Sequence, residues 1–246
     1  MEHIERDGRR LAYVATPGEG PGIVFLGGFK SDMTGTKAVH LEGWAKRRGR
    51  AFLRLDYSGH GASDGTFEEG TIPAWRDDAI AVIDAATEGP QILVGSSMGG
   101  WIALLIARDR PDRVAGLVTI AAAPDFTEDG YWAGFDDAQR RSVMEEGRVA
   151  VPSDYGDPYV VTRALIETGR DVLVLRAPLR LGVPVRLLHG TADADVPMAW
   201  GTRLLDHMEA EDATLTFAKG TDHRFSELRD LAMIEAATAD VLSRVG

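Results

Sequence analysis

Short apolar runs recur along this chain, and segments with helical character separate them. Five runs lie at residues 22–26, 51–55, 91–95, 114–120 and 185–190, and a sixth, rich in β-branched residues, lies at 213–217. Most are apolar throughout rather than at alternate positions, which is typical of parallel strands covered on both faces. The helical segments lie at 36–48, 73–86, 98–108, 198–208 and 226–244. This alternation predicts an α/β fold with a mostly parallel central sheet and helices on both faces.

Two further features organise the chain. Asp7-Gly8 is a two-residue turn signal between short strands, which predicts a β-hairpin at the amino end. Residues 124–182 separate two predicted strands by far more than a crossover helix requires, and such an insertion is usually a functional lid or cap. No repeat, low-complexity tract or flexible linker is visible. We therefore expect residues 1–246 to form one domain, with a cap insertion at about 124–182.

Composition and charge exclude several classes of partner. With 38 acidic and 27 basic residues the net charge is −11, which argues against nucleic acid and anionic membranes. The absence of cysteine excludes a thiol nucleophile, disulfides and thiolate metal sites. The opening MEHIERDGRR has no apolar core and does not resemble a secretory signal or transit peptide. We expect a soluble, cytoplasmic protein without membrane insertion, and the pattern predicts no particular oligomeric state.

The pattern G-x-S-x-G, typical of a nucleophile elbow, occurs twice, around Ser63 and around Ser97. An elbow needs a buried strand before the serine and a helix after it. Ser97 meets both demands, because QILVG precedes it and the apolar helical run MGGWIALLIARD follows it. Ser63 lies between the turn sequence SGHGA and the polar segment TFEEG, so no strand precedes it and no apolar helix follows it. Ser97 is therefore the predicted nucleophile, and Ser63 belongs to a Gly-rich loop.

A serine hydroxyl needs a base, and the base needs an orienting carboxylate. In sheets of this kind the acid and then the histidine follow the serine along the chain. The loop TADADVP offers two acids: Asp193, directly off a strand end, and Asp195, which is also explained as an acid near a helix start. We favour Asp193 and keep Asp195 as the alternative. His207 lies inside a helical pattern, so His223, in the loop before the last helix, is the predicted base.

Acyl transfer also requires donors for the oxyanion that forms on the substrate carbonyl. The backbone N–H of Met98 lies at the start of a helix and is the first predicted donor. The second is the N–H of Phe29 in the loop GGF at 27–29, although a tight turn alone would also explain Gly27-Gly28. This chemistry requires no cofactor and no metal.

Taken together, these elements resemble the α/β-hydrolase superfamily over nearly the whole chain. The stretches that carry a closer resemblance, to the abhydrolase-domain palmitoyl-protein thioesterase and mycophenolic acid acyl-glucuronide esterase family, are TGTKA, LDYSGHGASDGTFEEGT, GPQILVGSSMGGW, VPSDY, RLLHGTADADVP and TDHRF. The resemblance implies hydrolysis of acyl esters or thioesters of small molecules by Ser97, Asp193 and His223. An acyltransferase or peptidase with the same triad, or a non-catalytic binding or receptor protein on this scaffold, is the alternative.

The predicted cap is rich in aromatic side chains. Six of the 18 aromatic residues of the chain lie between positions 126 and 159: Phe126, Tyr131, Trp132, Phe135, Tyr155 and Tyr159. Such a concentration fits an apolar acyl pocket over the serine, and a hydrophobic core inside the cap explains it equally well. Arg140, Arg141 and Arg148 are interpreted as a solvated face rather than as an anion site.

Overall fold

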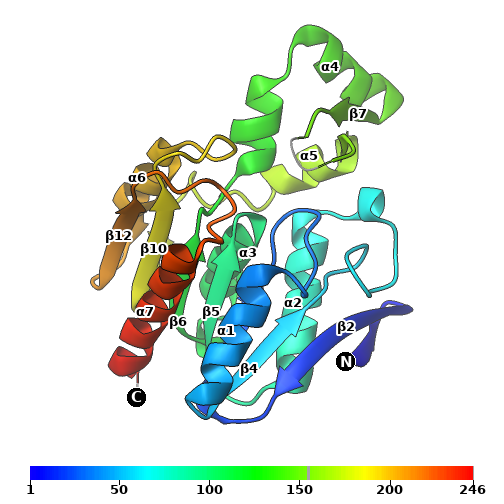
Figure 1. The fold of residues 1–246 in the computed structure, drawn as a ribbon. Helices are drawn as coiled ribbons and strands as arrows, with labels where there is room; N and C mark the ends of the chain where they lie inside the picture. The colour runs from blue at the N-terminus through cyan, green and yellow to red at the C-terminus, as the bar shows by residue number, and fades with distance from the viewer. Residues whose placement is uncertain (154–155, 246) are drawn as a thin grey trace.

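A computed structural model describes residues 1–153 and 156–245 of the chain (Figure 1). Within these residues, eight strands form one sheet in the order β1-β2-β4-β3-β5-β6-β10-β12. The strands β3, β4, β5, β6, β10 and β12 are parallel, while β1 and β2 form an antiparallel hairpin at one edge. Their bounds are β1 Glu2–Arg6, β2 Arg9–Thr16, β3 Glu19–Leu26, β4 Arg50–Leu55, β5 Gln91–Ser96, β6 Val114–Ile120, β10 Val185–Gly190 and β12 Ala213–Ala218.

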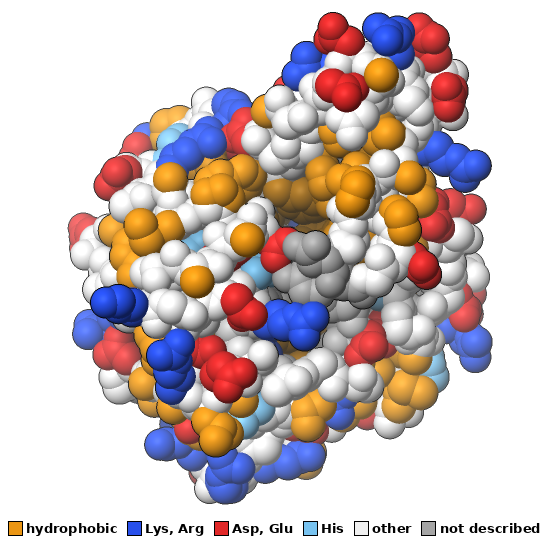
Figure 2. All heavy atoms as spheres, turned by 45° about the horizontal axis from the view of Figure 1, so that its top comes forward, with side chains coloured by type: hydrophobic (Ala, Val, Ile, Leu, Met, Phe, Trp, Pro, Cys, Tyr) orange, Lys and Arg blue, Asp and Glu red, His pale blue; other side chains and the backbone are white. Residues whose placement is uncertain are grey.

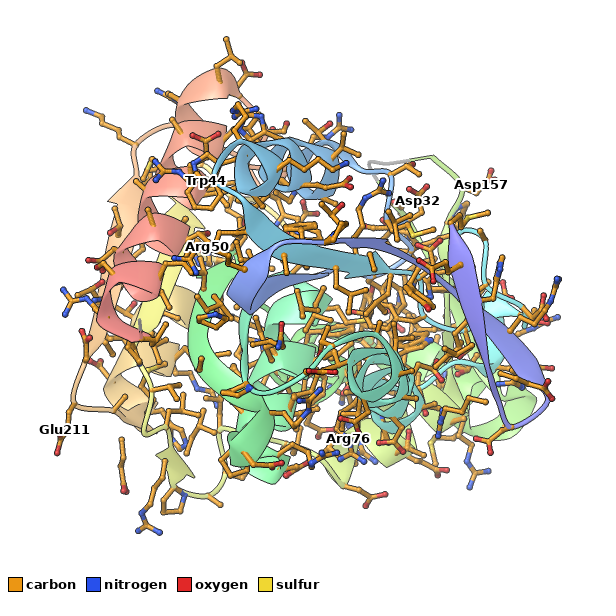
Figure 3. All side chains as sticks on the ribbon, turned by 90° about the horizontal axis from the view of Figure 1, so that it is seen from below. Asp32, Trp44, Arg50, Arg76, Asp157 and Glu211 are labelled. Atoms are coloured by element: carbon orange, nitrogen blue, oxygen red, sulfur yellow. The ribbon has the colours of Figure 1, made fainter. Side chains whose placement is uncertain are left out.

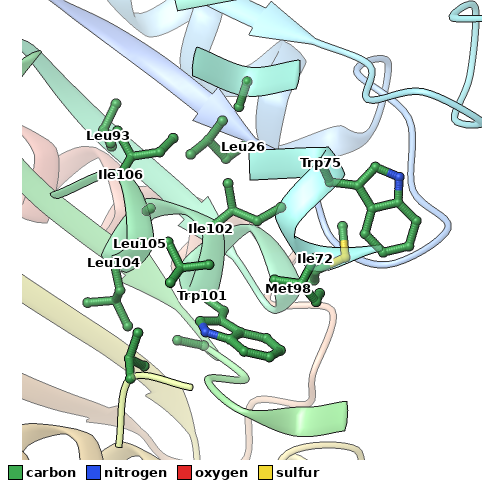
Figure 4. Close-up of a cluster of buried hydrophobic side chains, with 14 of the residues drawn as sticks. Leu26, Ile72, Trp75, Leu93, Met98, Trp101, Ile102, Leu104, Leu105 and Ile106 are labelled. Carbon is green, nitrogen blue, oxygen red and sulfur yellow. The ribbon is translucent and has the colours of Figure 1, made fainter. Parts of the chain in front are cut away.

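Helices cover both faces of the sheet and enclose two separate hydrophobic cores. One face carries α1 (Thr36–Arg47) and α7 (Leu228–Val245), and the other carries α2 (Ile72–Ala86), α3 (Met98–Asp109) and α6 (Met198–His207). Figure 3 shows Trp44 of α1 and Arg76 of α2 on opposite sides of the sheet. The core beneath α2 and α3 contains fully buried Trp75 and Trp101 (Figure 4). The mostly parallel α/β sheet and the amino-terminal hairpin predicted from the sequence are thus confirmed.

The segment 124–182 stands above the carboxyl ends of the parallel strands (Figure 1). It contains π-helical turns at Phe126–Trp132 and Ser142–Glu146, separated by α4 (Asp137–Arg141). A hairpin of β7 (Arg148–Val151) and β8 (Tyr159–Thr162) follows, and then α5 (Arg163–Arg170). Its last strand, β9 (Leu179–Arg180), pairs with β11 (Met208–Glu209) after α6. We call this segment the cap; the division of the chain into one domain with a cap insertion stays a prediction.

Among the described residues, every helix is too short or too polar to cross a bilayer. The longest helix is α7, whose apolar side chains Leu231, Ile234 and Val241 are buried against the sheet, while Arg244 near its end is paired with Asp240.

A buried carboxylate joins three elements at the β2–β4 side of the sheet. Glu42 of α1 accepts hydrogen bonds from Thr16 of β2 at 2.7 Å and from Arg54 of β4 at 2.9 Å, and Lys46 lies 2.7 Å away. Burial alone would raise the pKa of Glu42, but the hydrogen bonds from Lys46, Thr16 and Arg54 outweigh it and lower the pKa to about 2. The ionised form of Glu42 therefore stabilises the fold.

We predict that Glu42→Gln lowers the free energy of unfolding at pH 7 by about 2–3 kcal/mol, because the partly buried Arg54 guanidinium then pairs with a neutral amide instead of a carboxylate. The folded-state pKa lies below the unfolded value of about 4.3. The stabilisation is therefore complete above about pH 5 and is lost as the pH falls toward 2. Urea unfolding at several pH values measures it. The exposed pair Arg163–Glu167 supplies a control, since Glu167→Gln costs less than about 0.5 kcal/mol. A difference for Glu42→Gln that stayed constant between about pH 7 and 3 would contradict the prediction.

Candidate active site

Ser97 occupies a strained turn between β5 and α3. Its backbone has φ 53° and ψ −117°, a conformation that costs a non-glycine residue free energy and is characteristic of nucleophile elbows. The turn closes only because the neighbouring backbones can approach each other. A Cβ atom added to Gly95 would lie 2.3 Å from the carbonyl oxygen of Gly99, and one added to Gly99 would lie 2.1 Å from that of Leu26. Small residues on each side of Ser97 are therefore a steric requirement.

The three side chains that the sequence predicts as a triad meet at the carboxyl ends of the strands. His223, in the loop between β12 and α7, places Nε2 3.1 Å from Ser97 Oγ and Nδ1 2.9 Å from Asp193 Oδ2. The Asp193 side chain is fully buried and that of His223 is 17% exposed. Because an ionised carboxylate only accepts, the neutral His223 ring donates from Nδ1 and directs the Nε2 lone pair toward the serine hydroxyl.

The loop after β10 holds the Asp193 carboxylate in place. Its Oδ1 accepts the backbone N–H groups of Asp195 at 3.0 Å and Val196 at 2.8 Å, which leaves Oδ2 directed at His223. Buried His189 donates from Nε2 to the carbonyl of Val196 at 2.9 Å and supports the same loop. The carboxylate at hydrogen-bond distance from the imidazole is thus that of Asp193.

The two alternatives from the sequence take other places. Asp195 is exposed and lines the pocket, with a carboxylate oxygen within 4.8 Å of a ring nitrogen of His223. The helix α6 begins at Met198, as the sequence predicted, with Pro197 as its N-cap residue, so Asp195 lies before the helix. His207, at the end of α6, contacts the carbonyl of Ala177 at 2.8 Å.

The predicted oxyanion donors flank Ser97. Met98 is the first residue of α3, a position whose N–H has no intrahelical acceptor. Phe29 follows Gly28, and the Gly28 backbone lies so close that an added Cβ would stand 3.4 Å from Ser97 Cβ. Both Phe29 and Met98 line the pocket that contains Ser97 and His223. The assignment of their backbone N–H groups as oxyanion donors stays a prediction.

Ser63, in the competing G-x-S-x-G match, has a structural role. Its hydroxyl donates to the carbonyl of Asp56 at 2.7 Å and accepts the N–H of Ala12 at 2.8 Å. These bonds tie the Gly-rich loop after β4 to β2. Because both the proton and a lone pair of Ser63 are engaged by backbone groups, this hydroxyl is not presented to a substrate.

A pocket of about 860 Å³ lies between the cap and the sheet, over Ser97. Figure 2 shows this hollow, with hydrophobic side chains gathered in it. Its aromatic lining comes from Phe29, Phe126, Tyr131, Tyr159 and Trp200. The Phe29 ring makes edge-on contacts with Phe126 and Tyr159, both at 5.5 Å between centroids, and so connects the oxyanion loop to the cap.

The aromatic residues of the cap divide between the two roles that the sequence left open. Phe126, Tyr131 and Tyr159 line the pocket. Buried Phe135 does not line it and stacks on the ring of Tyr131. Trp132 packs beneath the guanidinium groups of Arg140 and Arg170. Tyr155 lies outside the described residues. Arg140 thus has a packing role; Arg141 and Arg148 are both exposed, and neither lines the pocket.

Trp200 and Lys37 are among the pocket residues that were not predicted from the sequence. Trp200 reaches the pocket from the first turn of α6, and Lys37 reaches it from the first turn of α1. Burial, reinforced by Arg224 and opposed by Asp222, lowers the pKa of Lys37 to about 8, and its Nζ donates to the carbonyl of Arg224 at 2.5 Å. Trp200 and Lys37 both follow a loop at the end of a strand, and this is the only signal in the sequence that could have indicated that they line the pocket.

A serine elbow after a central strand, an acid after β10 and a histidine after β12 define an α/β-hydrolase. Residues 23–143 match the family described as serine aminopeptidase, S33. The human palmitoyl-protein thioesterase ABHD10, a mitochondrial protein, is 36% identical over 96% of this chain and 77% of its own length. This chain belongs to the α/β-hydrolase family that includes ABHD10, which confirms the resemblance seen in the sequence motifs.

Two solved structures extend the comparison. A putative hydrolase from Agrobacterium vitis S4 superimposes with a TM-score of 0.93 and 39% identity, over 98% of this chain and 97% of the other. Mouse α/β-hydrolase domain-containing protein 10 superimposes with a TM-score of 0.92 and 34% identity, over 100% and 99% of the two chains. The α/β-hydrolase fold predicted from the sequence is therefore confirmed.

The close backbone contact at the elbow gives a direct stability prediction. In Gly99→Ala the new methyl group meets the Leu26 carbonyl, so β3 and α3 must separate, and we expect Tm to fall by about 5 °C or more. Gly134→Ala in the cap is the matched control, because nothing lies within 4 Å of its added Cβ and its Tm should not fall. Equal Tm values for the two variants in a thermal melt would show that the elbow does not require this contact.

Proposed function

We propose that this chain is a serine hydrolase that cleaves carboxylic ester or thioester bonds of small acyl substrates through an acyl-enzyme. The observation that carries the proposal is the continuous chain of hydrogen bonds from Ser97 Oγ through both nitrogens of His223 to buried Asp193. A serine hydroxyl is a weak nucleophile, and this arrangement supplies the base that activates it. The relatives named palmitoyl-protein thioesterase support the same reaction class.

In the first half-reaction, Ser97 Oγ bonds to the substrate carbonyl carbon while His223 Nε2 takes the hydroxyl proton. The carbonyl oxygen gains negative charge and accepts the N–H groups of Met98 and Phe29. When the carbon–oxygen double bond re-forms, the alcohol or thiol leaves with the proton held on Nε2, and an ester links the acyl group to Ser97. Asp193 stabilises the imidazolium throughout without taking its proton.

In the second half-reaction a water molecule replaces the leaving group. Its oxygen bonds to the acyl carbon as His223 Nε2 takes one of its protons, and the oxyanion again lies against Met98 and Phe29. Collapse releases the carboxylic acid, and Ser97 Oγ recovers its proton from His223. The acyl group fits the aromatic side of the pocket, formed by Phe126 and Tyr159.

A cytoplasmic location of the protein stays a prediction.

The direct test is hydrolysis of a graded panel of p-nitrophenyl esters and acyl-CoA thioesters. We expect Ser97→Ala to lower kcat by about 10⁴–10⁶-fold. Ser63→Ala is the matched control: it removes the hydrogen bonds to Asp56 and Ala12, so it lowers stability but leaves kcat within about threefold. Turnover that survives in Ser97→Ala, or no turnover of the panel by the unsubstituted protein, would contradict the proposal and favour a binding protein.

A second pair of variants tests the acid. Asp193→Asn should lower kcat by about 10⁴-fold, because the amide can donate to Nδ1 and stabilise the wrong tautomer of His223. Asp195→Asn should lower kcat by less than about tenfold, since its carboxylate lies beside the triad rather than at hydrogen-bond distance from the ring. Both variants are assayed on one p-nitrophenyl ester. Equal small losses would overturn the assignment of Asp193.

A further inference from the structure

A second histidine lies directly behind the oxyanion loop, in the Gly-rich loop after β4. His60 is 3% exposed, and both of its ring nitrogens have partners. Its Nδ1 lies 3.2 Å from the carbonyl oxygen of Ser58, and its Nε2 lies 3.3 Å from the backbone nitrogen of Lys30. The rings of Tyr57, Phe67 and Trp75 surround the imidazole with centroids 5.1–5.4 Å away. His60 is not among the described residues that line the pocket.

The two partners specify the protonation of this ring. A carbonyl oxygen can only accept and a backbone N–H can only donate, so Nδ1 carries the proton and Nε2 is the acceptor. Burial lowers the pKa of His60 to about 4, against the opposing effect of the Ser58 carbonyl, so the ring is neutral at pH 7. A protonated ring could not accept the N–H of Lys30.

The hydrogen bond reaches the loop that carries the predicted oxyanion donor. Lys30 follows Phe29 directly, and its backbone has φ 58°, a left-handed conformation that is unfavourable for lysine. Such a conformation persists only where surrounding contacts enforce it. At the other end of the same short loop, the Tyr57 hydroxyl donates to the carbonyl of Gly27 at 3.2 Å. Residues 57–60 therefore hold the 27–30 loop at both ends.

The platform beneath His60 is itself fixed. The Ser58 carbonyl also accepts Trp75 Nε1 at 3.0 Å, and buried Asp78 accepts the Ser58 N–H at 2.9 Å and its hydroxyl at 2.6 Å. Arg6 pairs with Asp78 at 2.6 Å. An anchored acceptor on one side of the ring and a strained backbone N–H on the other are the arrangement expected of a positioning group.

We propose that His60 is a positioning residue for the oxyanion hole: by accepting the Lys30 N–H it holds the adjacent Phe29 N–H toward the carbonyl oxygen of the substrate. The inference rests on the proposed function and adds a residue to it. His60 acts through the 27–30 loop rather than through contact with the substrate. Its loss should therefore weaken oxyanion binding and leave ground-state binding almost unchanged.

Two amide substitutions separate this role from a merely structural one. The amide of His60→Gln reaches about as far as Nε2 and can offer an oxygen to the Lys30 N–H, whereas that of His60→Asn reaches only about as far as Nδ1 and keeps the Ser58 contact. We expect the Asn variant to lose about 10²-fold in kcat with KM within about twofold, and the Gln variant to keep kcat within about tenfold. Binding of a trifluoromethyl ketone, which forms an oxyanion on Ser97, should weaken in parallel with kcat.

The outcomes are distinct. Turnover that depends on Ser97 is established first in the unsubstituted protein, and its absence would overturn the proposed function together with this inference. With turnover present, a wild-type kcat in His60→Asn, or equal kcat losses in the two variants matched by equal losses of Tm, would overturn the positioning role alone. If His60→Asn does not fold, ¹⁵N spectra of the unsubstituted protein decide: a His60 proton on Nδ1 supports the role, and one on Nε2 overturns it.

Discussion

The site depends on how closely three backbone segments approach one another at the turn before α3. Gly99 lies against the carbonyl of Leu26 at the end of β3, and Gly95 lies against Gly99 across the turn. This contact forces Ser97 into a left-handed conformation and lifts its hydroxyl out of the sheet. The same contact brings the loop after β3 beside Ser97, so one steric arrangement places the proposed nucleophile next to the two residues, Phe29 and Met98, that are proposed as N–H donors. Larger side chains at these positions would separate the components of the site.

Around this turn, the carboxyl ends of neighbouring parallel strands place the remaining groups. Asp193 follows β10 and His223 follows β12, and because these strands are adjacent and parallel, their loops emerge at one edge. The loop after β4 contributes support rather than chemistry. Its serine, Ser63, ties it to β2, and its histidine, His60, contacts the backbone of the 27–30 loop. The 27–30 loop beside Ser97 is thus held by a neighbouring loop that is itself hydrogen-bonded to β2.

The central sheet and the triad could be predicted because both depend on local sequence. Apolar runs without alternation indicate covered parallel strands, and Ser97 differs from Ser63 in the strand and helix beside it. The lining of the pocket could not be predicted, since Trp200 and the cap aromatics meet only after the chain folds. Composition alone could not tell that Tyr159 lines the pocket while Trp132 packs under arginines. Nor does any local pattern indicate that His60 contacts the backbone of Lys30, thirty residues away.

The most direct measurement of the central claim is a crystal structure of the protein after reaction with an alkyl fluorophosphonate, whose phosphonyl group mimics the tetrahedral intermediate. The account requires phosphorus bonded to Ser97 Oγ and the phosphonyl oxygen within hydrogen-bond distance of the backbone nitrogens of both Phe29 and Met98. It also requires His223 to remain between Ser97 and Asp193. An unmodified Ser97, phosphonylation at another residue, or a phosphonyl oxygen directed away from both N–H groups would contradict it.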